Sequence, residues 1–155
     1  MTGGAGYIGS LLVPALIDRF PKVTVLDTFA SGDTQLANCC ASRAFEPVRG
    51  DARDERLLDQ LVPNFDAIIP LAALVGAPMC ARDPIAATSI NRDAVLAIIK
   101  RMSSSQRLIY PTTNSGYGIG ESDAYCTEKT PLRPISLYGR CTTASGSQPS
   151  NTSPI

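Results

Sequence analysis

The sequence predicts an α/β fold, a doubly wound parallel sheet with helices on both faces, from three observations. A glycine-rich loop opens the chain, short β-branched segments alternate with helical ones, and polar residues follow the predicted strands. Alternation of this kind produces parallel strands joined by helical crossovers. Ligands of such sheets bind beyond the carboxyl ends of the strands, so the same observations predict a binding site at one edge.

The glycine-rich loop near the start of the chain reads T-G-G-A-G-Y-I-G. Gly3 permits a tight turn, Gly6 lets the backbone approach a phosphate, and Gly9 allows a helix to pack closely against a strand. The helix that follows directs its N–H groups and the positive end of its dipole at an anion. The loop, with Tyr7 and Ile8, therefore predicts a pyrophosphate site, although glycine-rich turns occur in many other loops.

A short β-branched strand over residues 22–27 ends in an acid, Asp27, 18 residues beyond Gly9. An acid at this distance can accept both ribose hydroxyls of an adenosine, and its charge repels a 2′-phosphate. The next two residues are Thr28 and Phe29, so no arginine follows directly to receive that phosphate. The sequence therefore favours NAD over NADP as the cofactor.

The first predicted helix spans residues 7–20, between the glycines and this strand. Its predicted buried stripe consists of apolar residues at helical spacing, Ile8, Leu11, Leu12, Ala15 and Leu16. Pro14 removes one helical hydrogen bond, so we expect a kink or a shorter helix. Because only two residues precede Gly3, we expect the first strand of the sheet to be cut short.

Strands and helices continue to alternate after Asp27. The predicted strands cover residues 45–48, 66–69 and 107–110, the predicted helices cover 54–61 and 84–103, and residues 31–43 form a polar loop or a short helix. Asp51 follows a strand, where it accepts a hydrogen bond from an adenine amino group, caps the next helix, or does both.

Small and polar residues later in the chain add three candidates for the same site. Ala72 and Ala73 follow a buried strand, where small side chains let a flat cofactor lie close. Ordinary strand-to-loop packing explains them equally well. Asn91 lies on the longer helix, where it either braces the active site or faces solvent, the commoner place for an amide.

The composition excludes several classes of function. The 155 residues, 44% of them apolar, suit one globular domain. The formal net charge is zero, without a basic block, so no nucleic-acid partner is expected. The absence of histidine excludes His-ligated metal sites and His-activated nucleophiles, and the five cysteines are expected to be buried or incidental thiols, so we expect no metal.

Membrane and secretory segments are also not expected. No stretch approaches the ~20 apolar residues that a membrane span needs, and a glycine loop stands where a signal peptide would have a basic region. These features predict a cytoplasmic protein without a membrane partner.

Two further segments make the order of motifs recognisable: T-T-N-S-G-Y-G at 112–118 and S-L-Y-G-R at 136–140. The chain resembles an extended short-chain dehydrogenase/reductase of the NAD-dependent epimerase/dehydratase group. The other matching pieces are the glycine loop, Asp27, G-D at 50–51, L-A-A at 71–73 and Asn91, so that the resemblance covers residues 1 to about 140. It implies an incomplete Rossmann-like fold that binds NAD, with a nucleotide sugar as substrate, and it leaves a homodimer open.

The resemblance also implies catalytic roles. Tyr138 becomes the acid/base, and Thr113 the hydroxyl that hydrogen-bonds the substrate oxygen. Members of this group oxidise a ring carbon transiently by hydride transfer to NAD and return the hydride after rearrangement. A tyrosine, with a reference pKa of about 10, needs a nearby cation to act as a base. The family has a lysine four residues on, whereas this chain has Thr142, and Arg140 lies on another side of the helix.

Three hypotheses therefore stay open: an NAD-dependent epimerase or dehydratase of nucleotide sugars, a non-catalytic NAD-binding remnant, and a fragment without a ligand. Residues 1–141 are interpreted as a partial NAD-binding domain and residues 142–155 as an uncharged, disordered tail rich in Ser, Thr and Pro. Residues 116–135 line part of a sugar pocket or form an exposed loop. Their charged and aromatic members are Glu121, Asp123, Tyr125, Glu128, Lys129 and Arg133.

Overall fold

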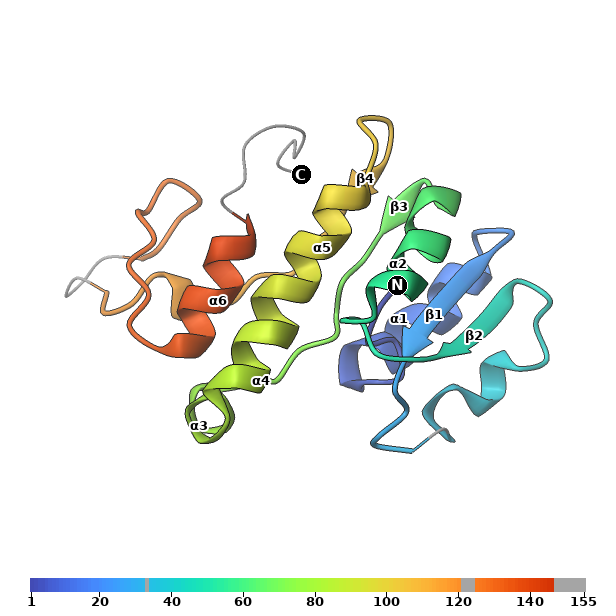
Figure 1. Ribbon diagram of the computed structural model, residues 1–155, viewed down its shortest axis with the longest axis horizontal. Coiled ribbons are helices and arrows are strands. Elements are labelled where there is room, and N and C mark those ends of the chain that lie inside the picture. The colour runs from blue at the N-terminus through green and yellow to red at the C-terminus, as the bar shows by residue number, and fades with distance from the viewer. Residues whose placement is uncertain (33, 121–124, 147–155) are drawn as a thin grey trace. The chain divides into compact units, whose positions relative to one another are not determined.

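The computed structural model of the chain, shown in Figure 1, describes residues 1–32, 34–120 and 125–146. The chain divides into two compact units. Unit 1 comprises Met1–Ala72 and Ala97–Tyr110, and unit 2 comprises Ala73–Leu96 and Pro111–Ile155.

Unit 1 is built on parallel strands. Strand β1 (Val23–Asp27) pairs with β2 (Phe45–Arg49), and β3 (Ala67–Ile68) pairs with β4 (Arg107–Leu108). The two pairs are joined by Thr2, which makes one parallel bridge to Leu26 of β1 and another to Pro70 beyond β3. The first strand of the sheet is thus represented by a single residue between β1 and β3. The order β2, β1, Thr2, β3, β4 is that of a doubly wound sheet, and it confirms the predicted fold class.

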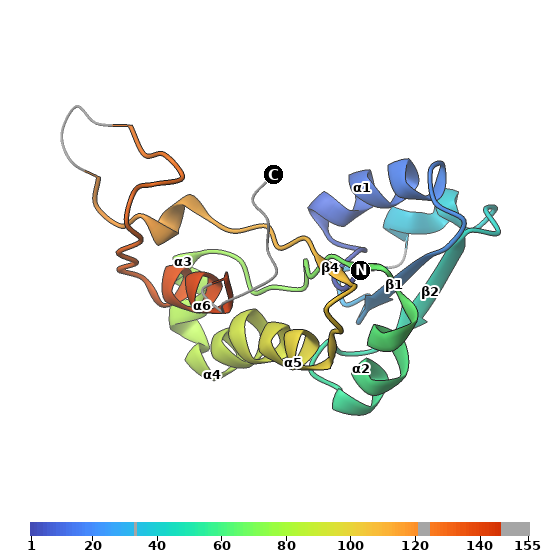
Figure 2. The ribbon, with the colours of Figure 1, turned by 90° about the horizontal axis from the view of Figure 1, so that it is seen from above.

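Helices cover both faces of the strands of unit 1. Figure 2 shows α1 (Tyr7–Ile17) on one side of β1 and β2, and α2 (Glu55–Leu61) on the other. Val13 of α1 packs with Val25 of β1, whereas Leu26, the next residue of β1, packs with Leu58 of α2. Successive strand residues point to opposite faces, so a short apolar strand fills two cores. Two 3₁₀ turns, η1 (Thr34–Cys39) and η2 (Val62–Asn64), complete this part of unit 1.

The buried face of α1 differs from the prediction. Val13 is fully buried, and Leu16 packs partly against the core, but Ile8 and Leu11 are 56% and 69% exposed. The helix approaches its neighbours through Gly9, so the buried face runs through Gly9 and Val13, four residues apart. The predicted stripe was therefore rotated away from the true one. The helix ends at Ile17, in line with the shorter helix expected from Pro14.

Unit 2 is helical. It contains α3 (Ala77–Arg82), α4 (Pro84–Thr88), η4 (Asn114–Gly116) and α6 (Leu137–Gly146). The predicted helix over residues 84–103 is one run, in which α4 passes through a π turn, η3 (Ser89–Asp93), into α5 (Ala94–Arg101). The residues of α5 from Ala97 on belong to unit 1. Helix α6 packs against α3, α4 and η3. The side chains buried in unit 2 include Cys80, Ala87, Asn91 and Cys141.

The predicted boundary of the tail at residue 142 needs correction, because α6 continues to Gly146. Thr142 and Thr143 are each only 8% exposed. Their hydroxyls donate to backbone oxygens one turn earlier, those of Tyr138 and Gly139. Burial and these bonds let two β-branched residues remain in a helix. Residues 147–155 of the predicted tail lie outside the described part of the chain.

Candidate functional site

The glycine loop leads from Thr2 into α1 and forms a tight cradle of backbone. Gly3 has a φ of +69°, and a Cβ at this position would lie 2.3 Å from the backbone nitrogen of Ala72. A Cβ on Gly9 would lie 2.3 Å from the backbone oxygen of Gly4. Gly9 therefore allows α1 to fold back closely on the loop itself. Gly6 is exposed and stands at the N-cap of α1.

Asp27 ties the end of β1 to this loop. One carboxylate oxygen, Oδ2, accepts a hydrogen bond from the backbone N–H of Ala5 at 2.9 Å, and the other, Oδ1, accepts from that of Phe29 at 2.8 Å. The backbone N–H of Gly3 also donates to the carbonyl of Leu26 at 2.9 Å. A carboxylate has about four acceptor positions, so Asp27 keeps capacity for ribose hydroxyls.

Asp51 lies at the end of the neighbouring strand but does not cap the helix. The carboxylate of Asp51 forms an ion pair with Arg53 at 2.6 Å. Hydrogen bonds from the Arg53 side chain lower the pKa of Asp51, so this carboxyl stays charged at neutral pH. The N-cap of α2 is Asp54, whose side chain accepts from the backbone N–H groups of Arg56 and Leu57. The helix-cap alternative for Asp51 is therefore wrong, and its adenine role stays a prediction.

Ala72 lies beside the glycine loop that Asp27 also contacts. The backbone N–H of Leu71 donates to the carbonyl of Thr2 at 2.9 Å, which runs this segment alongside the start of the loop. Gly3 then contacts Ala72, while Ala5 contacts Asp27. Tyr7 and Ile8 lie in the first turn of α1 and are 85% and 56% exposed. The glycine loop, Asp27 and Ala72 thus surround one short length of backbone.

Asn91 is the most deeply buried candidate of unit 2. Its side chain is 2% exposed. The amide oxygen accepts from the backbone N–H of Leu74 at 2.7 Å, and the amide nitrogen donates to the Leu74 carbonyl at 2.9 Å. The expectation of a solvent-facing amide is therefore wrong, and Asn91 braces the segment that follows Ala73. It lies in the π turn η3, and π turns are frequent at functional sites.

One buried thiol, that of Cys80, contacts this amide. The thiol of Cys80 donates to the Leu74 carbonyl at 3.2 Å, and the amide of Asn91 contacts its sulfur at 3.7 Å. Burial raises the pKa of Cys80, so the reactive thiolate is disfavoured. Cys141 of α6 is also buried. These cysteines act as small core residues, as expected.

Thr113 and Tyr138 lie on segments that pack against each other in unit 2. Thr113 caps η4, with its hydroxyl accepting from the backbone N–H of Ser115 at 3.2 Å. Tyr138 lies half-buried in the first turn of α6. The next residue, Gly139, approaches so closely that a Cβ there would lie 2.7 Å from the carbonyl oxygen of Ser115. A second glycine, Gly116, makes a similar approach to α6. The two glycines bring the threonine and tyrosine segments together.

Position 142, one turn beyond Tyr138, holds a threonine whose hydroxyl is used inside the helix. The Thr142 hydroxyl donates to the backbone carbonyl of Tyr138. The guanidinium of Arg140 donates to the carbonyl of Ile135, the residue two before α6. Neither contact is with the tyrosine side chain. The threonine and tyrosine are in place, but the lysine position does not carry a cation.

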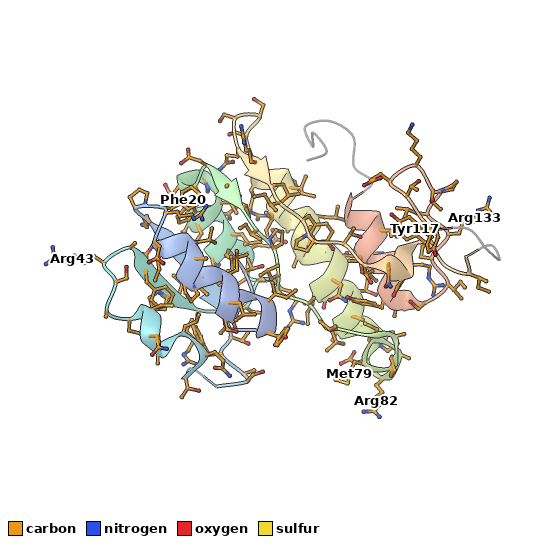
Figure 3. The ribbon with its side chains drawn as sticks, turned by 180° about the vertical axis from the view of Figure 1, so that it is seen from behind. Phe20, Arg43, Met79, Arg82, Tyr117 and Arg133 are labelled. Atoms are coloured by element: carbon orange, nitrogen blue, oxygen red, sulfur yellow. The ribbon has the colours of Figure 1, made fainter. Side chains whose placement is uncertain are left out.

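The loop between η4 and α6 is held near its ends. The backbone N–H of Arg133 donates to the carbonyl of Gly116 at 2.8 Å. Figure 3 labels Arg133 and Tyr117, the residue that follows Gly116. Tyr125, at the far end of the loop, is 96% exposed. Glu121 and Asp123 lie outside the described residues. The role of this loop as a sugar pocket stays a prediction.

Neither a metal centre nor a membrane span is found in the described ranges. Within residues 1–32, 34–120 and 125–146, no three His, Cys, Asp or Glu side chains gather in a way that could hold a metal ion. Over the same residues, no helix has the length and apolar character needed to cross a bilayer.

Comparison with known proteins gives consistent matches. Residues 1–148 match the NAD dependent epimerase/dehydratase family. A dTDP-glucose 4,6-dehydratase of Mycobacterium tuberculosis is 35% identical over 89% of this chain and 43% of its own length. A UDP-glucose 4-epimerase of Lactobacillus helveticus is 29% identical over 88% of this chain and 41% of its own length.

Solved structures agree with these relatives. The UDP-Glc/GlcNAc 4-epimerase of Campylobacter jejuni superposes with a TM-score of 0.83 at 28% identity, over 94% of this chain and 45% of that protein. The dTDP-glucose 4,6-dehydratase of Streptomyces venezuelae, solved with NAD bound, gives 0.84 at 28% identity, over 93% of this chain and 48% of that protein. The chain therefore spans less than half the length of these relatives.

Proposed function

Since this chain belongs to the NAD-dependent epimerase/dehydratase family, we propose that it binds NAD and serves the redox step of an epimerase or dehydratase acting on a nucleotide sugar. The observation that carries the proposal is the bond between Asp27 Oδ2 and the N–H of Ala5, at 2.9 Å. It joins the acid expected to hold a ribose to the loop expected to hold a pyrophosphate. This hydrogen bond supports a single site for both parts of a dinucleotide.

The residues of unit 1 fit such a cofactor. A side chain at Gly3 or at Gly9 would collide with the backbone, so the loop adopts this conformation because both positions are glycine. The first turn of the 11-residue helix α1 directs N–H groups and the positive dipole end toward the loop. Asp27 accepts ribose hydroxyls, and Ala72 leaves room for a flat group. When bound, NAD supplies the acceptor for a hydride from the substrate.

The residues of unit 2 suit a role in proton transfer. Thr113 positions a substrate hydroxyl by a hydrogen bond, and Tyr138 accepts the proton of that hydroxyl as the ring carbon is oxidised. Gly116 and Gly139 support these roles by allowing their segments to pack closely. Asn91 fixes the backbone at Leu74. A nucleotide-sugar substrate, a homodimer and a cytoplasmic location belong to the same proposal.

A second candidate function, NAD binding without catalysis, is favoured by Thr142. A phenolate needs a nearby cation at neutral pH, and a hydroxyl bonded to the Tyr138 carbonyl does not supply one. General acid/base catalysis contributes about 10²–10⁴-fold to a rate. Without the cation we expect turnover to be lower by a similar factor, while NAD binding in unit 1 is kept.

Turnover with and without a restored lysine separates the two functions. We expect the wild-type chain to bind NAD but to convert UDP-glucose or dTDP-glucose slowly or not at all, and Thr142→Lys to raise the rate by about 10²-fold or more. The matched control is Ala144→Lys, which adds the same charge at an exposed position of α6. Fast wild-type turnover contradicts the second function. If wild-type turnover is slow, no gain in a Thr142→Lys chain that binds NAD contradicts the first.

A further inference from the structure

Asp51 lies at the same edge of unit 1 as Asp27, the acid proposed to hold a ribose. The parallel register pairs Asp27 with Arg49, the last residues of β1 and β2, and Asp51 comes two residues later. The backbone N–H of Gly50 donates to the carbonyl of Asp27 at 2.9 Å, which joins the two strand ends. Ligands of parallel sheets bind at this edge. The carboxylate of Asp51 therefore belongs to the surroundings of the proposed adenosine site.

A tight turn after Gly50 holds the Asp51 carboxylate in place. The N–H of Asp54 donates to the carbonyl of Asp51 at 3.0 Å, and Ala52 between them is buried. The N–H of Arg53 donates to Oδ1 of Asp51 at 2.8 Å, a local bond by which an aspartate fixes its own turn. The backbone thus sets the position of this carboxylate, and a ligand can use only the acceptor positions that are left.

The side chain of Arg53 takes up these remaining positions. Its Nε donates to Oδ1 of Asp51 at 3.0 Å and to Oδ2 at 3.1 Å, and its Nη2 donates to Oδ2 at 2.6 Å. With the backbone N–H of Arg53, each carboxylate oxygen accepts two contacts, and a carboxylate has about four acceptor positions. Asp27, by contrast, accepts one bond at each oxygen. The acceptor capacity of Asp51 is therefore used within its own turn.

The pair of Asp51 and Arg53 is nevertheless accessible. The side chains of Arg53 and Asp51 are 44% and 38% exposed. An ion pair exposed to this degree contributes little to stability, and solvent or a ligand can exchange for one of its partners. A base that seeks a hydrogen bond from Asp51 must therefore compete with Arg53.

We propose that Arg53 is a specificity residue of the adenosine site: it occupies the carboxylate of Asp51, so that the site distinguishes adenine only weakly from a base without the amino group. The inference rests on the proposed NAD site of unit 1. The exocyclic amino group of adenine is a donor, whereas hypoxanthine has an oxygen in its place. An open carboxylate at Asp51 would select adenine, because it accepts from an amino group and repels a carbonyl oxygen. With both oxygens occupied, this selection is weak.

Titration calorimetry with NAD and with nicotinamide hypoxanthine dinucleotide tests the proposal on the wild-type chain and on Arg53→Gln. We expect wild type to bind both, with dissociation constants within about fivefold of each other. Arg53→Gln opens the carboxylate of Asp51, so NAD binding should tighten about two- to fivefold while binding of the hypoxanthine analogue does not tighten. Arg53→Lys, which keeps the charge but not the planar pairing, is expected to fall between the two.

Arg56→Gln is the matched control, because it removes the same charge from an exposed position in the first turn of α2. We expect this control to leave the ratio of the two dissociation constants unchanged. Asp51→Asn, with and without Arg53→Gln, completes a double-mutant cycle. Once the carboxylate is gone, Arg53→Gln should no longer change the ratio.

Carbon NMR of the Asp51 carboxyl group gives a readout that needs no nucleotide. Hydrogen bonds from the Arg53 side chain lower the pKa of Asp51 below its ordinary value of 3.8. Arg53→Gln should therefore raise the pKa of Asp51 toward that value, whereas Arg56→Gln should leave it in place. An unchanged pKa in Arg53→Gln would mean that the pair does not form in solution, and would overturn the proposal.

Three calorimetric results would also overturn the proposal, with circular dichroism to establish folding. A wild-type preference for NAD of more than about fivefold would mean that the site already reads the amino group. An unchanged ratio in Arg53→Gln would make Arg53 a support of the turn. Equal effects of Arg53→Gln and Arg56→Gln on the ratio would mean that only local charge matters.

Failure of the proposed function has a different signature. Binding of neither nucleotide by a folded wild-type chain would contradict the proposed NAD site, and the inference with it. Each of the three results above includes binding of NAD by wild type, so it would overturn the role of Arg53 and leave the proposed function standing.

Discussion

Unit 1 and unit 2 hold their candidate residues by different means. In unit 1 the glycine loop is fixed through its own backbone N–H groups: that of Gly3 donates to the carbonyl of Leu26, and that of Ala5 donates to the carboxylate of Asp27. In unit 2 the fixing groups are side chains that bond to backbone, as Asn91 does to Leu74 and Thr142 to Tyr138. The proposed binding in unit 1 therefore depends on glycines and one acid, whereas the proposed chemistry of unit 2 depends on several polar side chains. One of these, at position 142, differs from the family pattern.

The largest effect that would test this contrast is expected from Gly3→Ala in unit 1. The new methyl would occupy a residue with a φ of +69° and lie 2.3 Å from the nitrogen of Ala72. The backbone strain and the overlap together should lower the free energy of unfolding by about 2–5 kcal/mol. Urea unfolding measures the change.

The control for this change is Gly120→Ala. A Cβ at Gly120 meets nothing within 4 Å, so its cost should stay within about 0.5 kcal/mol. If both substitutions cost the same, the backbone of the loop is not what fixes unit 1.

Asn91→Ala tests whether a side chain that bonds to backbone fixes unit 2. It removes both bonds to the Leu74 peptide and leaves a cavity in a buried site, so we expect a loss of about 2–3 kcal/mol in the free energy of unfolding. The control is Asn38→Ala, at an exposed position of η1, with an expected change within about 0.5 kcal/mol. Equal stability of the two variants would show that the amide does not brace unit 2.

Gly139→Ala sharpens the comparison within unit 2. The added methyl would lie 2.7 Å from the carbonyl oxygen of Ser115 and push η4 away from α6, at a cost of about 1–3 kcal/mol. We expect faster hydrogen exchange at the amides of Gly116 and Tyr117, which bond inside η4. The amide of Leu26 in unit 1 serves as the internal reference. Faster exchange at Leu26 alone would contradict the packing described for Gly139.

The smallest effect is expected from Glu46→Gln, on the outer strand of unit 1. Hydrogen bonds from Thr24 and Lys22 lower the pKa of Glu46 in the folded chain. A lowered pKa stabilises the fold above the ordinary value of 4.5, and this stabilisation disappears as the pH falls through the folded pKa. The variant should therefore lose less than about 1 kcal/mol at pH 7, and the difference should close in more acidic solution.

Stability curves of wild type and Glu46→Gln between pH 7 and pH 3 provide the measurement. The control is Glu128→Gln, at an exposed position of the loop before α6. If the stability difference between wild type and Glu46→Gln grew as the pH fell, the pH dependence would have the opposite sign to the one expected. That result would contradict the ion pair between Glu46 and Lys22.

Much of unit 1 could be predicted from the sequence because its signals are local. A β-branched run predicted the strand that ends at Asp27, and a strand was predicted over residues 45–48, where β2 extends one residue further, to Arg49. The spacing of the glycines predicted the loop. The buried face of α1 could not be predicted, because it depends on how Gly9 lets the helix approach Gly4. Both Ile8 and Val13 are apolar, and only the fold decides which one is buried.

Contacts between distant residues explain the other misses. Asparagine is usually a surface residue. Asn91 can be buried because its amide bonds to the backbone of Leu74, 17 residues earlier. Thr142 opens an uncharged stretch, yet it is helical because its hydroxyl bonds inside α6.

The measurement that tests the central claim most directly is NAD titration by calorimetry on wild type, Asp27→Ala and the control Asp66→Asn, with circular dichroism to establish folding. Asp66 is an exposed acid before β3, so its variant changes the charge without touching the loop. Saturable binding by wild type and Asp66→Asn, lost in a folded Asp27→Ala, is the predicted result. Absence of saturable binding by folded wild type, or equal binding by Asp27→Ala, would contradict the assignment of the Asp27 and glycine-loop group as the cofactor site.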